Sequence, residues 1–285
     1  CLTQWLCDAG IQFTVSNKKR AVMSLPPVQI STLAQLSGGQ DWRLTLAHDR
    51  PSHLVIWITR GQGRLLLNGT RRGVGTHNAM SIPPNTLFSL ELGRQSMGLV
   101  AVIPDGTEVR LPAGPRQLRL RDVDAISELT GLFEAAQREV QSDRALSQDA
   151  LDAHIALISV WLRRQIAQPG NLPVPMNAAA RLSAAVCDRV VKHHADGQTM
   201  ADHAAALGVT PTHLTRATKS ASGRTAADLL TERVLYAARI ALTTTDVPIQ
   251  DVARHLGFGS AAYFTRFMQQ HTAQTPSALR KSARH

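Results

Sequence analysis

The last hundred residues contain an internal repeat, which constrains the fold more than any other feature of the sequence. Met200–Thr212 aligns with Ile249–Ala261 at an offset of 49 residues, and one inserted residue then makes the offset 50. The alignment pairs identical residues: Asp202 with Asp251, Ala204 with Ala253, Leu207 with Leu256, Gly208 with Gly257, Thr215 with Thr265, Arg216 with Arg266, Thr225 with Thr275 and Leu229 with Leu279. The chain therefore holds two copies of one supersecondary unit.

Each copy has the signals of two short helices joined by a tight turn. Leu207-Gly208 places a glycine where a helix ends in the left-handed conformation, and Thr210-Pro211 supplies an N-cap followed by proline at the first helical position. In the second copy, the second helix would begin near Ser260. This pattern predicts a helix-turn-helix, twice. Between the copies, Ala226–Leu242 predicts a continuous helix about 25 Å long, which would hold the two second helices roughly one turn of DNA apart.

The positive charge of the chain is concentrated in the same region. The 31 basic and 21 acidic residues give a net charge of +10, and only five of the basic residues are lysines. Residues 177–285 carry 13 basic and seven acidic side chains (net +6), against 18 and 14 (net +4) in residues 1–176. Guanidinium groups make paired contacts with phosphates and with guanine, so this charge predicts double-stranded DNA as a partner.

Residues 182–284 resemble the DNA-binding domain of AraC/XylS transcription regulators. The residues that carry the resemblance are Ala204–Thr210, Leu214-Thr-Arg216, Arg233-Val-Leu-Tyr-Ala237, Gly257–Arg266, Thr275-Pro276 and Arg280. The sequence departs from the family pattern at Thr218 and Met268, where an aromatic is usual, and at Ala273, where a glycine is expected. The resemblance implies a transcription regulator, in our interpretation an activator, that recruits RNA polymerase and responds to a small-molecule effector.

Seven residues on the predicted second helices are expected to contact bases: Thr212, Thr215, Arg216, Ala261, Ala262, Tyr263 and Arg266. Arginine can bridge O6 and N7 of guanine, whereas the two alanines offer only apolar contact with thymine methyl groups. Five further residues are expected to contact phosphates: Thr210, Lys219, Arg224, Ser260 and Lys281. The alternative for each charged residue is a solvated surface position.

The first half of the chain has a different pattern. From Leu44 to Ile103, short apolar runs alternate with turn signals, among them Asn68-Gly69, which suits a type I′ hairpin. We expect an antiparallel β-barrel or sandwich, similar to a cupin-type sensor barrel, over residues 1–115. Two amphipathic helices would follow over residues 116–168 and pack on the barrel or form a homodimer. A proline-rich linker over residues 169–176 leads to the all-α domain of residues 177–285, which makes the chain an α+β multidomain protein.

One motif in the first half suggests an effector. Arg60-Gly-Gln-Gly-Arg64, shortly after Trp57, resembles the arginine pair by which PilZ-type modules bind cyclic di-GMP. In that interpretation the guanidinium groups contact phosphates and stack on guanine. The alternative is a β-hairpin flanked by surface arginines.

The sequence favours a regulator over two other classes, a cupin-type enzyme with a basic tail and a nonspecific DNA-binding protein. His48, His53 and His77 lack the H-x-H spacing of a cupin metal site, and no catalytic triad, paired acid and base or phosphate loop is present, so we expect no metal, cofactor or enzyme activity. Apolar runs such as Leu54–Ile58 are far shorter than the ~20 residues of a membrane span. Three cysteines without CxxC spacing favour the cytoplasm, and a start at Cys1 suggests that the natural start lies upstream.

Overall fold

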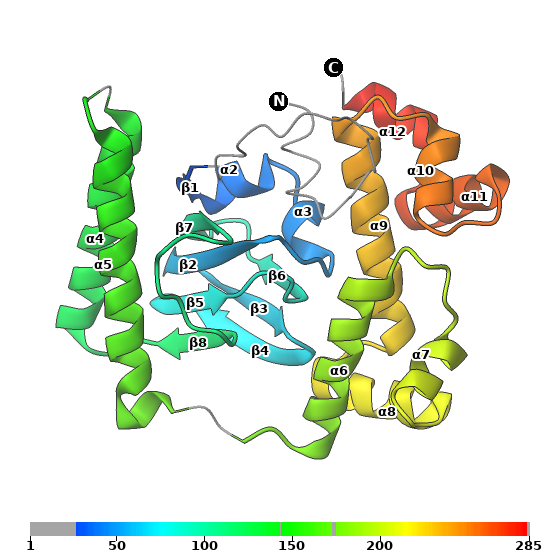
Figure 1. The fold of residues 1–285 in the computed structure, drawn as a ribbon, viewed down its shortest axis with the longest axis horizontal. Helices are drawn as coiled ribbons and strands as arrows, with labels where there is room; N and C mark the ends of the chain where they lie inside the picture. The colour runs from blue at the N-terminus through cyan, green and yellow to red at the C-terminus, as the bar shows by residue number, and fades with distance from the viewer. Residues whose placement is uncertain (1–26, 143, 173–174, 284–285) are drawn as a thin grey trace.

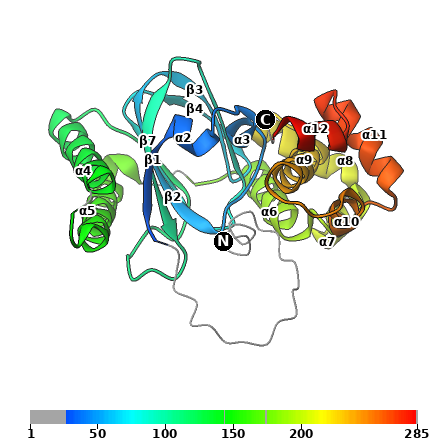
Figure 2. The same ribbon diagram turned by 90° about the horizontal axis from the view of Figure 1, so that it is seen from above.

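The chain folds into a domain of two antiparallel sheets that lies between a helical hairpin and a C-terminal helical domain (Figure 1, Figure 2). The computed structural model describes residues 27–142, 144–172 and 175–283. Residues 1–26 of the predicted sensor domain, and Pro173 and Val174 of the predicted linker, lie outside the described residues. The α+β fold class is confirmed.

The eight strands form a five-stranded sheet in the order β1-β7-β2-β5-β8 and a three-stranded sheet in the order β4-β3-β6. The strands are β1 (Gln29–Thr32), β2 (Ser52–Arg60), β3 (Gln62–Leu67), β4 (Thr70–Gly75), β5 (Asn78–Ile82), β6 (Phe88–Leu92), β7 (Met97–Pro104) and β8 (Arg116–Arg119). Two short helices, α2 (Leu33–Ser37) and α3 (Trp42–Thr45), follow β1. No ladder joins the sheets among the described residues, so the predicted barrel is an open sandwich.

Successive side chains of a strand point to opposite faces of the sheet, and apolar side chains lie on both faces. Leu54, Ile56 and Ile58 of β2 pack against Leu65 and Leu67 of β3 in the interior of the sandwich. The predicted hairpin turn is confirmed, because Asn68 and Gly69 both have positive φ, at 44° and 74°.

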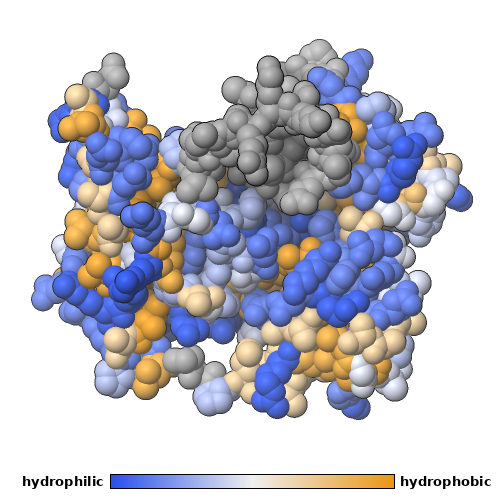
Figure 3. Space-filling view, viewed as in Figure 1, coloured by the Kyte–Doolittle hydropathy of each residue, from blue (hydrophilic) through white to orange (hydrophobic). Residues whose placement is uncertain are grey.

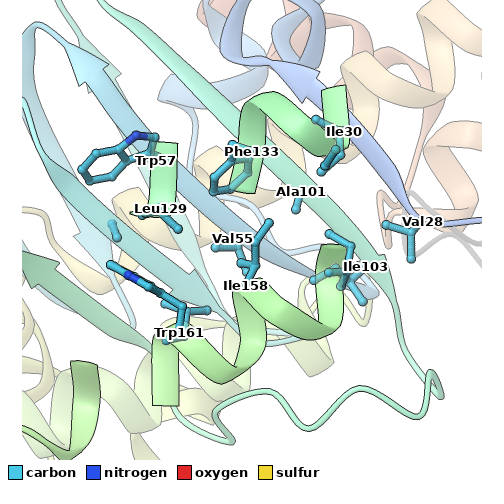
Figure 4. Close-up of a cluster of buried hydrophobic side chains, with 14 of the residues drawn as sticks. Val28, Ile30, Val55, Trp57, Ala101, Ile103, Leu129, Phe133, Ile158 and Trp161 are labelled. Carbon is cyan, nitrogen blue, oxygen red and sulfur yellow. The ribbon is translucent and has the colours of Figure 1, made fainter. Parts of the chain in front are cut away.

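The helical hairpin covers the outer face of the five-stranded sheet. It consists of α4 (Val123–Gln141) and α5 (Ser147–Ala167). Leu129 and Phe133 of α4 and Trp161 of α5 pack on Val55 and Trp57 of β2 (Figure 4). The prediction that the helical segment begins at residue 116 is wrong, since residues 116–119 pair with β5 as an edge strand and Leu118 joins this core.

The C-terminal domain contains the predicted tandem helix-turn-helix. Its helices are α6 (Ala178–His193), α7 (Met200–Ala206), α8 (Pro211–Ser222), α9 (Ala226–Thr244), α10 (Ile249–His255), α11 (Ala261–Thr272) and α12 (Pro276–Ser282). The turn glycines Gly208 and Gly257 have φ of 66° and 77°, as the helix-end pattern predicts. A short 3-10 helix, η1 (Pro169–Asn171), precedes this domain. In the described part of the chain, no helix has the length and apolarity needed to cross a membrane.

Helix α9 also connects the two domains. The buried guanidinium of Arg233 forms an ion pair with Asp49, in the loop before β2. The preceding residue, Glu232, accepts a hydrogen bond from the backbone N–H of Ala47 at 2.9 Å. The Tyr236 ring stacks on His48 with a centroid separation of 4.3 Å. One face of α9 is therefore held by a polar and aromatic contact with the sandwich.

The Asp49–Arg233 pair gives a stability prediction. Asp49→Ala leaves a buried guanidinium without its carboxylate, which should lower the free energy of unfolding by about 3–5 kcal/mol. Urea denaturation followed by circular dichroism measures this change. Asp152→Ala, at an exposed position on α5, is the control and should change the free energy by less than about 0.5 kcal/mol. Equal losses in both variants would contradict the role of the pair.

Candidate nucleic-acid interface

Helix α8 exposes the residues that the sequence predicts for base contacts. Thr212, Thr215 and Arg216 are exposed, whereas Leu214 and Ala217 are buried against the rest of the domain. The helix begins at an N-cap, Thr210, whose hydroxyl accepts a hydrogen bond from the backbone N–H of His213 at 3.2 Å. The 3.6-residue period thus places the three candidate readers on the solvent face of the helix.

The Arg216 side chain has one partner on its own helix. Its Nη2 lies 3.3 Å from Nδ1 of His213, one turn earlier. Because guanidinium only donates, this contact requires the histidine tautomer with a free Nδ1. The remaining Arg216 donors face solvent and can form the paired contact that guanine accepts.

Helix α11 presents the second set of candidate readers. Ala261, Ala262, Tyr263 and Arg266 are exposed, and Tyr263 keeps 58% of its surface accessible. The N-cap Ser260 accepts a hydrogen bond from the N–H of Tyr263 at 3.1 Å, as Thr210 does in the first unit. The two units therefore expose matching positions, with Arg216 and Arg266 at equivalent places.

The candidate phosphate contacts are only partly available. Thr210, Lys219, Ser260 and Lys281 are exposed. Arg224 is different: it forms ion pairs with Glu91 of β6 and, at 2.6 Å, with Glu232 of α9. Its Nη1 also lies 3.2 Å from Ser89 Oγ. In this arrangement Arg224 is a contact between the two domains, and its guanidinium is already paired with two carboxylates, unlike the free cation that the sequence suggests.

The departures from the family pattern have structural consequences. The Thr218 side chain is buried in the first unit, and its hydroxyl has no partner among the described residues. Met268 is fully buried at the corresponding place in the second unit and fills the core with apolar atoms. Ala273, where a glycine is expected, has a φ of 57°, a conformation that L side chains adopt at a cost.

Ala273 gives a matched pair of predictions. Ala273→Gly should raise the free energy of unfolding by about 0.5–1 kcal/mol, because glycine has no Cβ to strain the left-handed C-cap of α11. Gly223→Ala, at the equivalent C-cap of α8 with a φ of 78°, should lower it by about 1 kcal/mol. Thermal and urea denaturation measure both changes. Changes of the same sign in the two variants would contradict this explanation.

The three predicted effector residues do not meet at one site. Trp57 is buried under α4, with its Nε1 donating to Thr130 Oγ1 at 3.2 Å (Figure 4). Arg60 on β2 and Arg64 on β3 are exposed, and Arg64 pairs with Gly73 and Glu91 within the three-stranded sheet. The sequence predicts that Trp57 binds the effector with them, but its ring belongs to the core between the five-stranded sheet and the hairpin and does not face these arginines' solvent surface.

The sequence analysis missed a cluster of cations at the domain junction. A cavity of about 280 Å³ is lined by Trp42 from α3, by Arg239 from α9 and by polar residues of both domains. The guanidinium carbons of Arg239 and Arg43 lie 4.4 and 5.4 Å from the centroid of the Trp42 ring. Both arginines have a buried Nε without a hydrogen-bond partner among the described residues, and burial lowers the pKa of each side chain.

This cluster had no local sequence signal. Arg43 and Arg239 are nearly two hundred residues apart and come together only because α9 packs on the sandwich. Unpaired guanidinium groups beside an aromatic ring can hold an anion with an apolar or planar part. The cavity is thus a second candidate for the effector site.

Comparison with known proteins supports the helix-turn-helix assignment. Residues 203–282 match the family described as a helix-turn-helix domain. The arabinose operon regulatory protein of Salmonella typhimurium is 26% identical over 156 residues, which cover 54% of this chain and 52% of that protein. The aligned stretch therefore spans about half the length of this relative.

Solved structures of similar proteins include ToxT of Vibrio cholerae, at 11% identity and a TM-score of 0.42, covering 89% of this chain and 97% of that chain. The C-terminal domain of AraT from Geobacillus stearothermophilus is 24% identical, with a TM-score of 0.35, and covers 38% of this chain and 88% of that chain.

The C-terminal part of the chain is a helix-turn-helix domain. The match and the arabinose operon relative confirm the resemblance to AraC/XylS regulators that the sequence motifs predict.

Proposed function

We propose that the chain is a sequence-specific DNA-binding transcription regulator controlled by a small-molecule effector that binds its N-terminal half. The observation that carries the proposal is the repeated unit itself. In each unit one helix, α8 or α11, exposes an arginine at the equivalent position, and the 19-residue helix α9 joins the two units. This rigid connector fixes the separation of α8 and α11. Such an arrangement suits two successive major grooves on one face of DNA.

In this mechanism the positive field of the helical domain attracts DNA, and phosphate contacts set the register. Lys219, Lys281 and the N-cap hydroxyls of Thr210 and Ser260 would make these contacts. Arg216 and Arg266 would then read guanine, with Thr212, Thr215, Ala261, Ala262 and Tyr263 in apolar or weaker polar contacts. Activation by recruitment of RNA polymerase is part of the same proposal.

The base-reading role has a direct test. Arg216→Ala and Arg266→Ala should each reduce the preference for the selected site over random duplex by about 1–3 kcal/mol, because each removes one paired contact with guanine. The site is first selected from a random DNA library with the full chain, and affinities are then measured by fluorescence anisotropy.

Lys281→Ala is the control and should weaken binding to both duplexes by a similar factor. If the two arginine variants also weakened both duplexes equally, the chain would be a nonspecific DNA-binding protein. A cupin-type enzyme with a basic tail is the remaining alternative, and stoichiometric metal in the purified protein would favour it.

The effector is proposed to be an organic anion. Cyclic di-GMP is the candidate suggested by Arg60 and Arg64, which are exposed and would bind it without Trp57. The cavity beside Trp42, Arg43 and Arg239 is the other candidate binding site, and the Trp42 side chain lines it. The two sites belong to different parts of the sandwich and can be separated by mutation.

Calorimetric titration of the full chain with cyclic di-GMP tests this part. We expect binding at micromolar concentrations, abolished by Arg60→Ala/Arg64→Ala if the hairpin binds the ligand. Loss of binding in Arg43→Ala/Arg239→Ala instead would place the ligand at the domain junction. No heat at tens of micromolar would reject cyclic di-GMP while leaving DNA binding untouched.

A homodimer through the helical hairpin completes the proposal. Several large apolar side chains are exposed on or beside α4 and α5, where Figure 3 shows apolar residues among polar ones. They are Val123, Val140, Leu146 and Leu157, with exposed fractions of 50–74%. These exposed apolar side chains support a partner for the hairpin.

A further inference from the structure

Strand β4 of the sandwich carries two arginines that face no acidic residue across the sheet. Between Pro51 and Leu90 the sequence contains no aspartate or glutamate, and its charged residues are Arg60, Arg64, Arg71 and Arg72. Arg71 and Arg72 are adjacent on β4, the edge strand of the three-stranded sheet. Both are exposed, and neither forms a salt bridge with a described residue.

Arg71 lies next to the first recognition helix. It pairs with Leu66 of β3, whose side chain packs in one cluster with Leu214 of α8, so this face of the sheet is turned toward the helical domain. At the C-cap of α8, a Cβ placed on Gly223 would lie 3.3 Å from Nη1 of Arg71. An exposed cation of the sandwich therefore touches the end of the helix that carries Lys219 and Arg216.

Arg72 points to the other face of β4. It pairs with Leu65, and the charge of Arg116 on β8 acts on it. The outer part of the Arg72 side chain is exposed, but partial burial first, and then this neighbouring guanidinium, lower its pKa. Because Arg72 faces β8 and not α8, it lies outside the surface that Arg71 shares with the helical domain.

We propose that Arg71 forms a DNA-backbone contact that the N-terminal domain contributes, beside Lys219 on α8. The proposal rests on the DNA-binding function proposed above. DNA phosphates are the partner that the surface fits, because they are anions repeated along a strand and α8 would already lie in the adjacent groove. Arg64 adds little positive charge to this surface, because Glu91 lies directly across from it on β6.

This contact would make affinity for DNA depend on how the two domains are arranged. The helical domain alone carries the base-contacting residues, but Arg71 reaches the same duplex only while β4 packs against α8. The sandwich would thus add binding energy without adding base specificity.

The test uses the full chain and a mixed-sequence duplex, with affinities measured by anisotropy from about 50 to about 200 mM KCl. Each lost phosphate contact should reduce the slope of log K against log salt by about 0.9. Arg71→Ala should therefore reduce it by about 0.9, so that the loss of affinity is about 3.5-fold larger at the lower salt than at the higher salt. Arg71→Lys keeps the charge and should restore most of the slope.

Arg164→Ala is the matched control, because it removes one exposed arginine from α5, on the side of the sandwich away from the helical domain (Figure 1). The molar mass of this variant is checked by light scattering, because α5 belongs to the hairpin proposed to form the dimer, and the melting temperatures of all variants are compared. The control should leave the salt slope within about 0.3 of the wild type. An equal slope change in both variants, or none in the β4 variant, would overturn the proposal. Failure of the wild-type chain to bind any duplex would reject the proposed function itself.

Discussion

The arrangement of the two domains depends on the buried ion pair between Arg233 and Asp49. A guanidinium that is 1% exposed has lost its hydration, so the interface tolerates it only while the carboxylate is in place. A second pair, between Arg224 and Glu91, closes the interface where α9 begins. The sandwich is thus attached to the helix that separates the two readers, and it leaves the exposed faces of α8 and α11 free.

The aromatic residues next to this ion pair leave no room for a further charge in the interface. His48 is fully buried between Tyr236 and Phe88, and burial lowers its pKa well below the usual value, so the ring is neutral in this arrangement. The nearby Arg50 acts in the same direction. Packing of neutral rings around the Arg233–Asp49 pair favours one fixed arrangement of the two domains, because a relative shift of the domains would leave a buried charge without its partner.

The parts of the fold that the sequence predicted are those set by local chemistry. The caps Thr210 and Ser260, the turn glycines and the Asn68-Gly69 hairpin act within a few residues, and each occurs where the pattern places it. Long-range partners have no such signal. Arg224 looks like a surface cation in sequence, but it meets a carboxylate 133 residues away, and Trp57 is covered by a helix that begins 66 residues later. Similarly, residues 116–119 become a strand because the edge of β5 is available.

The junction cavity lies on the same helix as the ion pair, and this position determines what an effector there would do. Arg239 follows Arg233 by six residues, about 9 Å along α9. An anion held by Arg239 from α9 and by Trp42 and Arg43 from the sandwich would contact both domains at once. A ligand shifts an equilibrium only by its difference in affinity for the two states. Such a ligand would therefore favour the joined arrangement, in which β4 packs against α8, and would increase any DNA affinity that Arg71 supplies.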